Sequence, residues 1–296
     1  MNSTHEHEML MEILQHPDFA FATGARQVSW AEPVKATLRT HWPEYLMESA
    51  ELGVFMLAAC FFTVLLQHPA SPIRLGIADP TLRRVLTGAA MGATAIALIY
   101  SPWGKQSGAH LNPAVTLTFA RLKKVAPWDA FFYVLAQFTG GVLGVGLASL
   151  ALGVSVSNHA VRFAATMPGP QGAGVAFIAE AAISFGLMTM ILNVSNSSLA
   201  RYTGLFAGVL VMAYISLEAP FSGMSMNPAR SFASALPLRL WDALWVYFTA
   251  PPVGMLAAAE LYTAVHGAKS VICAKLHHQN DRRCIFHCGY REQVQQ

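Results

Sequence analysis

Two short segments of the chain share five residues in register. Residues 107–116 read Ser-Gly-Ala-His-Leu-Asn-Pro-Ala-Val-Thr, and residues 222–231 read Ser-Gly-Met-Ser-Met-Asn-Pro-Ala-Arg-Ser. In each Asn-Pro-Ala the asparagine suits the N-cap of a helix and the proline suits its first position. A capping asparagine keeps amide hydrogens that it can donate to a passing molecule. This spacing therefore favours hydrogen bonding to a mobile solute over covalent chemistry.

Each triplet predicts the start of a short helix. The triplets are Asn112, Pro113, Ala114 and Asn227, Pro228, Ala229. A helix of about ten residues after each asparagine would be roughly 15 Å long, half of the hydrocarbon core of a bilayer. Two such half-helices entering from opposite sides would bring their N-termini together near mid-membrane. Their partial positive charges would then repel cations, including a proton carried along a file of water.

Arg230 directly follows the second triplet, at the position that Val115 has in the first. A permanent cation at membrane depth is costly and almost always faces water or a partner. We interpret Arg230 as lining a pore near its outer mouth, where it donates to the solute and excludes cations. The alternative is a structural ion pair with a buried carboxylate such as Glu218.

The rest of the chain has the composition of a membrane protein. Its 296 residues are 54% hydrophobic and only 12% charged, with a net charge of +3 and a mean hydropathy of +0.42. A soluble chain carries about 25% charged residues, so an ordinary cytosolic enzyme, a nucleic-acid binder and a disordered chain are excluded. Segments of about 20 apolar residues can span a bilayer. Six are predicted, at 45–67, 82–100, 128–152, 174–194, 203–218 and 241–266.

The order of the segments predicts an inverted repeat. Residues 107–121 and 222–237 are too short to cross, and both fit re-entrant segments. Three spans lie between them, and an odd number inverts the second half relative to the first. Glu48 and Glu180 also recur, each in the first helix of its half. Inverted repeats that meet at the midplane are a known way to build a transport path.

Basic residues predict the orientation, because Lys and Arg favour the cytoplasmic side. Cytoplasmic termini place most of them inside, and Arg83 and Arg84 are a local exception on the outer side. Residues 1–43 have no basic start followed by an apolar run, so we expect a retained tail and no cleaved signal peptide.

At the two motifs the chain resembles the aquaporin (major intrinsic protein) family, and in particular its water channels. The resemblance covers roughly residues 44–266, with repeats at about 44–152 and 174–266. It leaves the tails 1–43 and 267–296 unmatched. It implies an all-α membrane protein with six transmembrane helices and two half-helices, one pore per chain and a homotetramer. It also implies that Asn112 and Asn227 meet at the pore centre.

The resemblance also assigns supporting roles. Glutamates at the places of Glu48 and Glu180, and a glutamine at the place of Gln137, brace the loops in that family. The backbone carbonyl of a histidine like His110 faces the pore, and Arg230 would belong to the outer constriction that selects solutes.

The remaining filter positions are less well defined by the resemblance. Met224 takes the loop position, Met91 or Gly92 the second-span position, and Tyr214 or Ile215 the fifth-span position. Ser231 after the second motif and the pair Tyr247-Phe248 favour water over glycerol. Water-selective members usually carry a histidine in the fifth span, and 203–218 has none. Its absence weakens water selectivity and leaves glycerol, ammonia or carbon dioxide as alternative solutes.

Two other functions could use similar features. An alternating-access transporter also uses broken helices and inverted repeats. Coupling would need titratable groups along the route, and the carboxylates Glu48, Glu51, Glu180 and Glu260 are few and lie mostly toward helix ends. An intramembrane hydrolase fails, because Asn227 stands where the second glycine of a nucleophile elbow should be.

The tail residues His277, His278, Cys284, His287 and Cys288 are all of types that bind zinc. Their spacing matches no common site, and we expect no metal there. Cys60 and Cys273 complete the four cysteines, and no disulfide framework is expected.

The predicted function is therefore a passive channel, mainly for water, driven by osmotic gradients, with ions and protons excluded. We expect no enzymatic activity, cofactor or nucleic-acid partner. The partners are water, the lipid bilayer and other copies of the chain. The expected location is the plasma membrane or the bacterial inner membrane, with both termini cytoplasmic.

Overall fold

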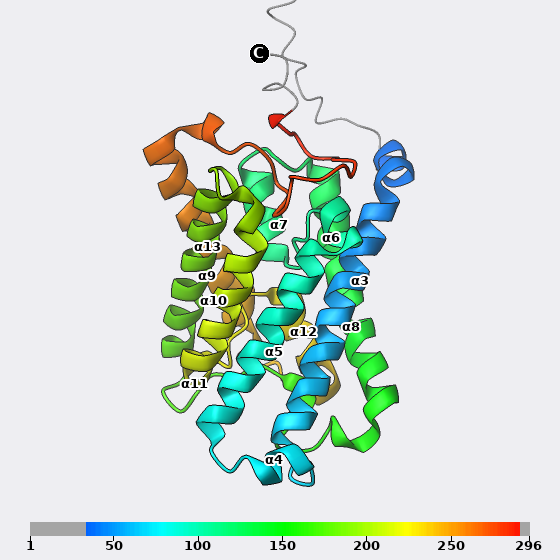
Figure 1. Ribbon diagram of the computed structural model, residues 1–296, viewed down its shortest axis with the longest axis vertical. Helices are drawn as coiled ribbons and strands as arrows, with labels where there is room; N and C mark the ends of the chain where they lie inside the picture. The colour runs from blue at the N-terminus through cyan, green and yellow to red at the C-terminus, as the bar shows by residue number, and fades with distance from the viewer. Residues whose placement is uncertain (1–33, 291–296) are drawn as a thin grey trace, which may run out of the picture.

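Six long helices form the framework of the computed structural model, which describes residues 34–290 (Figure 1). Each is long and apolar enough to cross a membrane. They are α3 (Val34–Gln67), α5 (Pro80–Tyr100), α8 (Pro127–Leu152), α9 (Ala173–Ser195), α10 (Thr203–Leu217) and α13 (Leu244–His266). All six overlap the predicted spans, and the described part of the chain contains no strand. The prediction of an all-α membrane fold is confirmed.

The connections contain five shorter α-helices and several single 3₁₀ turns. The helices are α4 (Pro72–Gly76), α6 (Pro102–Ser107), α7 (Pro113–Arg121), α11 (Ala219–Ser222) and α12 (Pro228–Ala235). The turns are η1 (Gly153–Ser155), η2 (Arg162–Ala164), η3 (Ala200–Tyr202), η4 (Leu236–Leu238) and η5 (Ala268–Ser270). Helices α7 and α12 are the two half-helices predicted from the repeated motif.

Proline at the first position starts many of these helices. Asp79 caps α5 by accepting from the backbone N–H of Thr81, and Pro80 follows it. Ser101 caps α6 in the same way, and Pro102 follows. Proline lacks the N–H that the first turn would leave unpaired, and its fixed φ suits the helix. The start points are therefore encoded locally.

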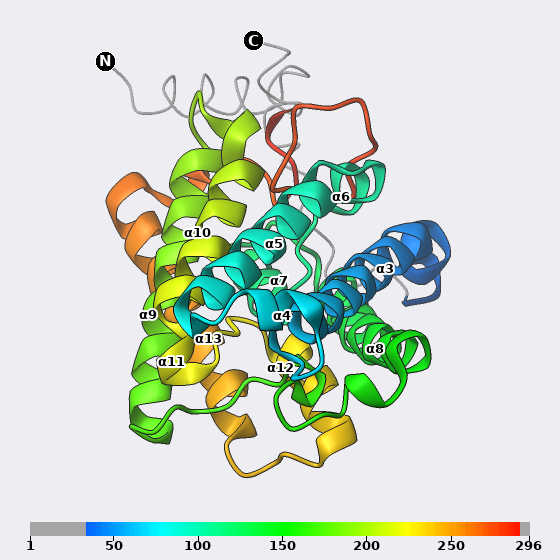
Figure 2. The same ribbon diagram turned by 60° about the horizontal axis from the view of Figure 1, so that its bottom comes forward.

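The helices pack in pairs related by the repeat. Helix α3 lies along α8, α9 lies along α13, and α5 of the first half lies along α10 of the second (Figure 2). The close α3–α8 contact depends on Gly140 and Gly144 of α8, because a side chain at either position would meet the backbone of Ser49 or Gly53. Small residues permit this approach between membrane helices.

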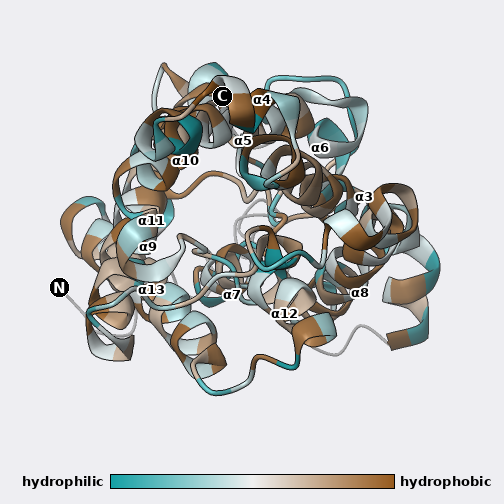
Figure 3. Ribbon diagram, turned by 90° about the horizontal axis from the view of Figure 1, so that it is seen from below, coloured by the Kyte–Doolittle hydropathy of each residue, from teal (hydrophilic) through white to brown (hydrophobic). Residues whose placement is uncertain are grey.

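The half-helices lie inside this framework, α7 toward the end that carries the C-terminal segment and α12 toward the opposite end (Figure 1). Helix α7 packs against α13 of the other half and α12 packs against α8, so the halves interlock (Figure 3). Leucines on the outer surfaces, including Leu46, Leu143, Leu205 and Leu261, are exposed. An apolar exterior of this kind is what a lipid-facing surface requires.

The N-terminal boundary differs from the prediction. Helix α3 begins at Val34 and not after residue 43, so the end of the expected tail is helical. Lys35, Arg39 and Pro43 interrupt the apolar pattern there, which hid the first turns. The rest of that tail, 1–33, and residues 291–296 lie outside the described residues.

The start of α3 and residues 267–290 lie at the same end of the bundle, which we call the tail face (Figure 1). The opposite end, which carries α4, is the far face.

Candidate functional site

The loops before α7 and α12 have matching and unusual backbones. Ala109 and Leu111 have φ of 55° and 51°, and their counterparts Met224 and Met226 have φ of 50° and 55°. The left-handed region costs an ordinary L-residue roughly 1–2 kcal/mol. Such conformations persist only where the surroundings impose them. The two loops must therefore be held by other parts of the structure.

Glu48 holds the first loop. Its carboxylate, fully buried in α3, accepts from the backbone N–H groups of His110 and Leu111, both at 2.8 Å. Gln137 of α8 donates to the same carboxylate at 2.8 Å. These bonds pair the buried backbone donors that the left-handed turns leave outside any helix.

Glu180 holds the second loop in the same way. It accepts from the backbone N–H of Ser225 at 2.6 Å and from that of Met226 at 2.7 Å. The Ser222 hydroxyl donates to it at 2.7 Å. Glu48 and Glu180 therefore brace equivalent positions, 110–111 and 225–226, from equivalent helices.

A pair of tyrosines completes the bracing, a role that the sequence analysis assigned to neither of them. The Tyr133 hydroxyl donates to the Ser107 carbonyl at 2.7 Å. The Tyr247 hydroxyl donates to the Ser222 carbonyl at 2.5 Å. Ser107 and Ser222 are the first residues of the repeated motif, so each loop is fixed at both ends. In the 115-residue register of the motifs Tyr133 pairs with Phe248, one residue from Tyr247, so the sequence repeat alone does not match the two tyrosines.

The two asparagines meet between the half-helices. Asn112 caps α7 by accepting from the Ala114 N–H at 2.9 Å, and its amide nitrogen donates to the Met226 carbonyl at 2.6 Å. Asn227 caps α12 and donates to the Leu111 carbonyl at 2.7 Å. An amide nitrogen has two hydrogens. Each asparagine donates one of them to a carbonyl of the opposite loop, and the other is available for a solute. Both line the same cavity.

That cavity, of about 570 Å³, runs from the far face past the asparagines. Its far-face end is lined by Gln67 and Arg84, and by residues 160–167 of the loop between α8 and α9. Its middle is lined by the residues before each triplet, 109–111 and 223–226. The route thus follows the two loops that Glu48 and Glu180 brace.

Arg230 lines the cavity one turn beyond Asn227. Its Nη1 is buried and has no hydrogen-bond partner within residues 34–290. The alternative pair with Glu218 is not formed, since no ion pair between described residues includes Arg230. A buried guanidinium with a free donor facing a cavity can bind a polar solute there.

The other candidate filter residues differ in whether they face the cavity. Met91, Ile215 and Met224 line the cavity. Gly92 instead faces α10, where an added Cβ would meet Met212. The Tyr214 ring points to Gly186 of α9 and is absent from the lining. Thr87, one turn from Met91, also lines the cavity. The sequence analysis did not name it, because the packing of α5 decides which of its sides faces the cavity.

The chain after α13 meets the cavity at the tail face. Leu276 lines it there together with Ile99 and His110. The His110 ring lies 2.9 Å from the Ala274 carbonyl through Nε2 and stacks on Phe286 with ring centroids 5.3 Å apart. The C-terminal segment is therefore part of the site, and the sequence analysis had left it unassigned.

Comparison with known proteins agrees with this geometry. The model of the major intrinsic protein family matches residues 10–262 of the chain. The chain therefore belongs to the major intrinsic protein family, and its six long apolar helices make it an integral membrane protein.

Relatives by sequence include plant proteins, several of them named as aquaporins. A putative aquaporin NIP4-1 of Arabidopsis thaliana is 37% identical over 177 residues, 59% of this chain and 60% of that protein. Nodulin-26 of Glycine max is 33% identical over 177 residues, 59% of this chain and 63% of that protein. The matched region thus spans less than two thirds of these relatives.

A solved structure has the same fold. The aquaglyceroporin from Plasmodium falciparum superimposes with a TM-score of 0.62 and covers 76% of this chain and 96% of its own, at 22% identity. At that identity the likeness concerns the fold alone.

Proposed function

We propose that the protein is a passive channel that conducts water along osmotic gradients and excludes ions and protons. The observation that carries this proposal is the set of donors along one cavity: Asn112, Asn227 and Arg230. These groups, with the loop carbonyls, can replace the few hydrogen bonds that a neutral molecule loses on entering. An ion loses far more hydration energy than such a lining returns.

Proton exclusion follows from the half-helices. Helices α7 and α12 begin at the asparagines, so their N-terminal partial charges point at the same region of the cavity. A water molecule that accepts from an asparagine there turns its own hydrogens away from it, which interrupts a proton-carrying file. Arg230 adds a full positive charge one turn away.

The lining favours a channel over a coupled transporter. Among the described residues no carboxylate lines the cavity. Glu48 and Glu180 are occupied by backbone N–H groups of the loops. His110 lines the cavity, but its ring nitrogens are engaged, 3.0 Å from the Thr116 hydroxyl and 2.9 Å from the Ala274 carbonyl. A transporter would need a titratable group free to exchange protons with the solute path.

A second solute class is supported by the filter. Met91, Ile215 and Met224 line the same cavity as Arg230, so the solute meets both apolar and polar side chains. A small uncharged solute with both hydroxyl and hydrocarbon surface fits such a lining. Glycerol is therefore the second candidate substrate.

The remaining parts of the proposal concern the setting of the channel. We place the tail face in the cytoplasm, because most Lys and Arg then lie inside. The filter of Arg230 then faces the outside of a plasma or bacterial inner membrane. The oligomer is proposed to be a homotetramer with one pore per chain.

Osmotic jumps on proteoliposomes test both solutes. With an impermeant osmolyte, light scattering should report protein-dependent fast shrinkage, and its absence would contradict the channel. With glycerol, reswelling should separate the second candidate from strict water selectivity.

The variant Ile215→His sharpens this test, since it adds a donor to the fifth-span position and reduces its apolar surface. We expect glycerol reswelling to slow several-fold while water flow changes less. Tyr214→His is the matched control, because Tyr214 points away from the cavity. Equal effects of the two variants would contradict the assigned filter.

A further inference from the structure

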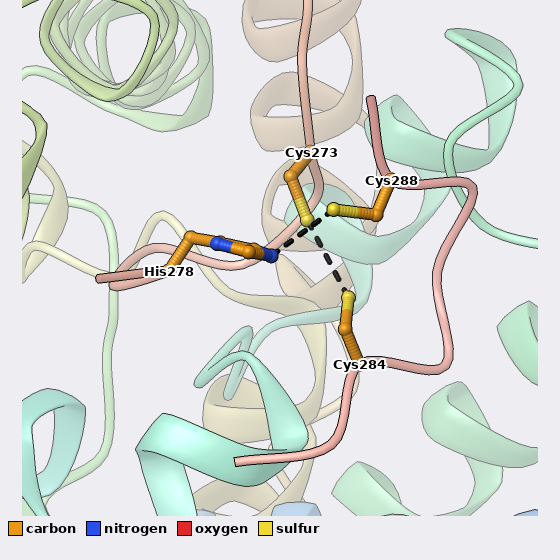
Figure 4. A group of neighbouring side chains, drawn as sticks. All are labelled: Cys273, His278, Cys284 and Cys288. Atoms are coloured by element: carbon orange, nitrogen blue, oxygen red, sulfur yellow. Dashed lines mark hydrogen bonds between the residues drawn. The ribbon is translucent and has the colours of Figure 1, made fainter. Parts of the chain in front are cut away.

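Four side chains of the C-terminal segment point toward one another at the tail face (Figure 4). They are Cys273, His278, Cys284 and Cys288, and their donor atoms all lie within 4.8 Å of one another. The Sγ atoms of Cys273 and Cys284 are 3.6 Å apart, and Sγ of Cys288 is 3.0 Å from Nε2 of His278. A disulfide would need about 2.05 Å between sulfurs, and all four cysteines of the chain are free.

The fold selects one histidine from the three in this segment. The His278 ring stacks on Tyr290, with centroids 4.2 Å apart, and directs Nε2 toward the thiols. His277 turns its ring to Tyr100 instead. His287 directs Nδ1 to the Lys123 carbonyl at 2.8 Å. The cluster thus contains Cys273, which the sequence analysis did not count among the candidate ligands, and omits His277 and His287.

Three thiols and one imidazole are a ligand set for zinc. Structural zinc is bound tetrahedrally by Cys and His, and Zn–S bonds of about 2.3 Å put two sulfurs about 3.8 Å apart. The observed 3.6 Å is close to that edge. No carboxylate belongs to the cluster, so magnesium and calcium, which prefer oxygen ligands, do not fit.

The charges around the cluster also fit a metal-thiolate site. Three thiolates and a zinc ion leave one negative charge. Lys275, only 2% exposed, lies two residues after Cys273. Its ammonium donates to the carbonyls of Lys105, Arg282 and Arg283, which fixes a positive charge in the same segment.

The segment has little regular structure of its own, so a metal cross-link would stabilise its arrangement. Residues 271–289 contain no helix or strand, yet Val271, Ala274 and Leu276 are buried. Few backbone hydrogen bonds order such a segment, and small irregular units usually need a metal or disulfides. A metal bound only by the folded form would add its binding free energy to this arrangement.

The same segment covers the first re-entrant loop. The Leu276 N–H donates to the Gly108 carbonyl at 3.1 Å, and Leu276 lines the cavity. Phe286, between Cys284 and Cys288, stacks on His110. Arg283 donates to Glu44 of α3 at 2.9 Å. The cluster therefore lies directly behind the residues that meet the end of the pore.

We propose that Cys273, His278, Cys284 and Cys288 bind one zinc ion, and that this ion holds residues 271–290 as a cap on the tail-face mouth of the pore. The proposal of a metal site depends only on the geometry of the four side chains and not on the function of the channel. The capping role rests on the proposed channel function.

Metal content tests the site without any transport assay. The purified full-length protein, loaded with zinc and freed of excess, should contain one zinc per chain by elemental analysis. The variant Cys284→Ser should lose it, and His287→Gln, a neighbouring histidine outside the cluster, should retain it. Cys60→Ser, a buried cysteine of α3, controls for loss of a thiol. Equal zinc content in all four proteins, or none in the unmodified protein, would overturn the site.

Cobalt supplies a second readout that reports geometry. Cobalt(II) in place of zinc should show the intense visible bands of a tetrahedral thiolate site in the unmodified protein and in His287→Gln. Weak octahedral bands in both would overturn the tetrahedral site, even if metal were retained. A gel-filtration profile unchanged in Cys284→Ser would show that its loss of metal is not a loss of fold.

Proteolysis and flux test the cap. Trypsin should cleave after Arg282 or Arg283 much faster in Cys284→Ser, or after chelation with EDTA, than in zinc-loaded protein. Osmotic water permeability of proteoliposomes should rise several-fold in the same two cases and stay unchanged in His287→Gln. Faster cleavage with unchanged permeability would overturn the cap but not the metal site. No water flow in any state would contradict the proposed channel, and zinc content would still decide the site.

Discussion

The first re-entrant segment, 107–121, and the second, 222–235, have the same bracing up to their asparagines and different surroundings after them. Each has a glutamate on two backbone N–H groups, a tyrosine on its first carbonyl and an asparagine on the opposite loop. Beyond the asparagine, α7 has Val115 where α12 has Arg230.

The ends of the two segments also meet different parts of the chain. The loop before α7 is covered by the C-terminal segment through His110 and Leu276. Ser231 of α12 is hydrogen-bonded to Thr166 of the loop between α8 and α9, at 2.7 Å. The repeat thus builds a symmetric centre, and the proposed filter and the proposed cap come from side chains that differ between the two halves.

The largest expected effect tests whether the bracing is symmetric. Glu48→Ala and Glu180→Ala each leave two buried backbone donors unpaired, at about 1–3 kcal/mol for each donor. We expect both to lower the free energy of unfolding by about 2–6 kcal/mol and to reduce water flow strongly. Thermal unfolding in detergent measures the first and proteoliposome shrinkage the second.

Glu260→Ala is the control for these two variants. Its carboxylate pairs with Arg121 at 2.8 Å, and both side chains are more than half exposed. We expect a change below about 1 kcal/mol. A large loss of stability or water flow in only one of the Glu48 and Glu180 variants would show that the two loops are not braced equally.

The next effect tests the asymmetry of the half-helices. Arg230→Ala removes the only guanidinium of α12 that faces the cavity, so we expect glycerol and small cations to pass several-fold faster. Val115→Ala, at the equivalent place of α7, should leave the solute profile unchanged. Solute-driven reswelling and a dye-based cation leak measure the two. An unchanged solute profile in Arg230→Ala would contradict the proposed role of Arg230 in selecting solutes.

The smallest effect concerns the tyrosines. Tyr133→Phe and Tyr247→Phe each remove one hydrogen bond to a loop carbonyl. We expect each to lower the free energy of unfolding by about 1 kcal/mol and by similar amounts. Tyr202→Phe, on an exposed ring, should have no measurable effect. Clearly unequal losses for Tyr133 and Tyr247 would show that the two loops are held by different forces.

The sequence by itself determined the helices and their inverted order. Apolar length predicts a span, and Asn-Pro-Ala predicts a helix start, because both depend on neighbouring residues only. The six spans and the half-helices α7 and α12 were therefore predictable to within a few residues. The beginning of α3 was not, since Pro43 and charged residues interrupt its pattern.

Only the tertiary structure decided which side chains face the cavity and which meet across the chain. Met91 rather than Gly92, and Ile215 rather than Tyr214, line it because packing of α5 against α10 sets the rotation of each helix. Cys273 joins His278 because the segment after α13 folds back over the first loop. Both outcomes depend on contacts between residues distant in the chain, which no local pattern encodes.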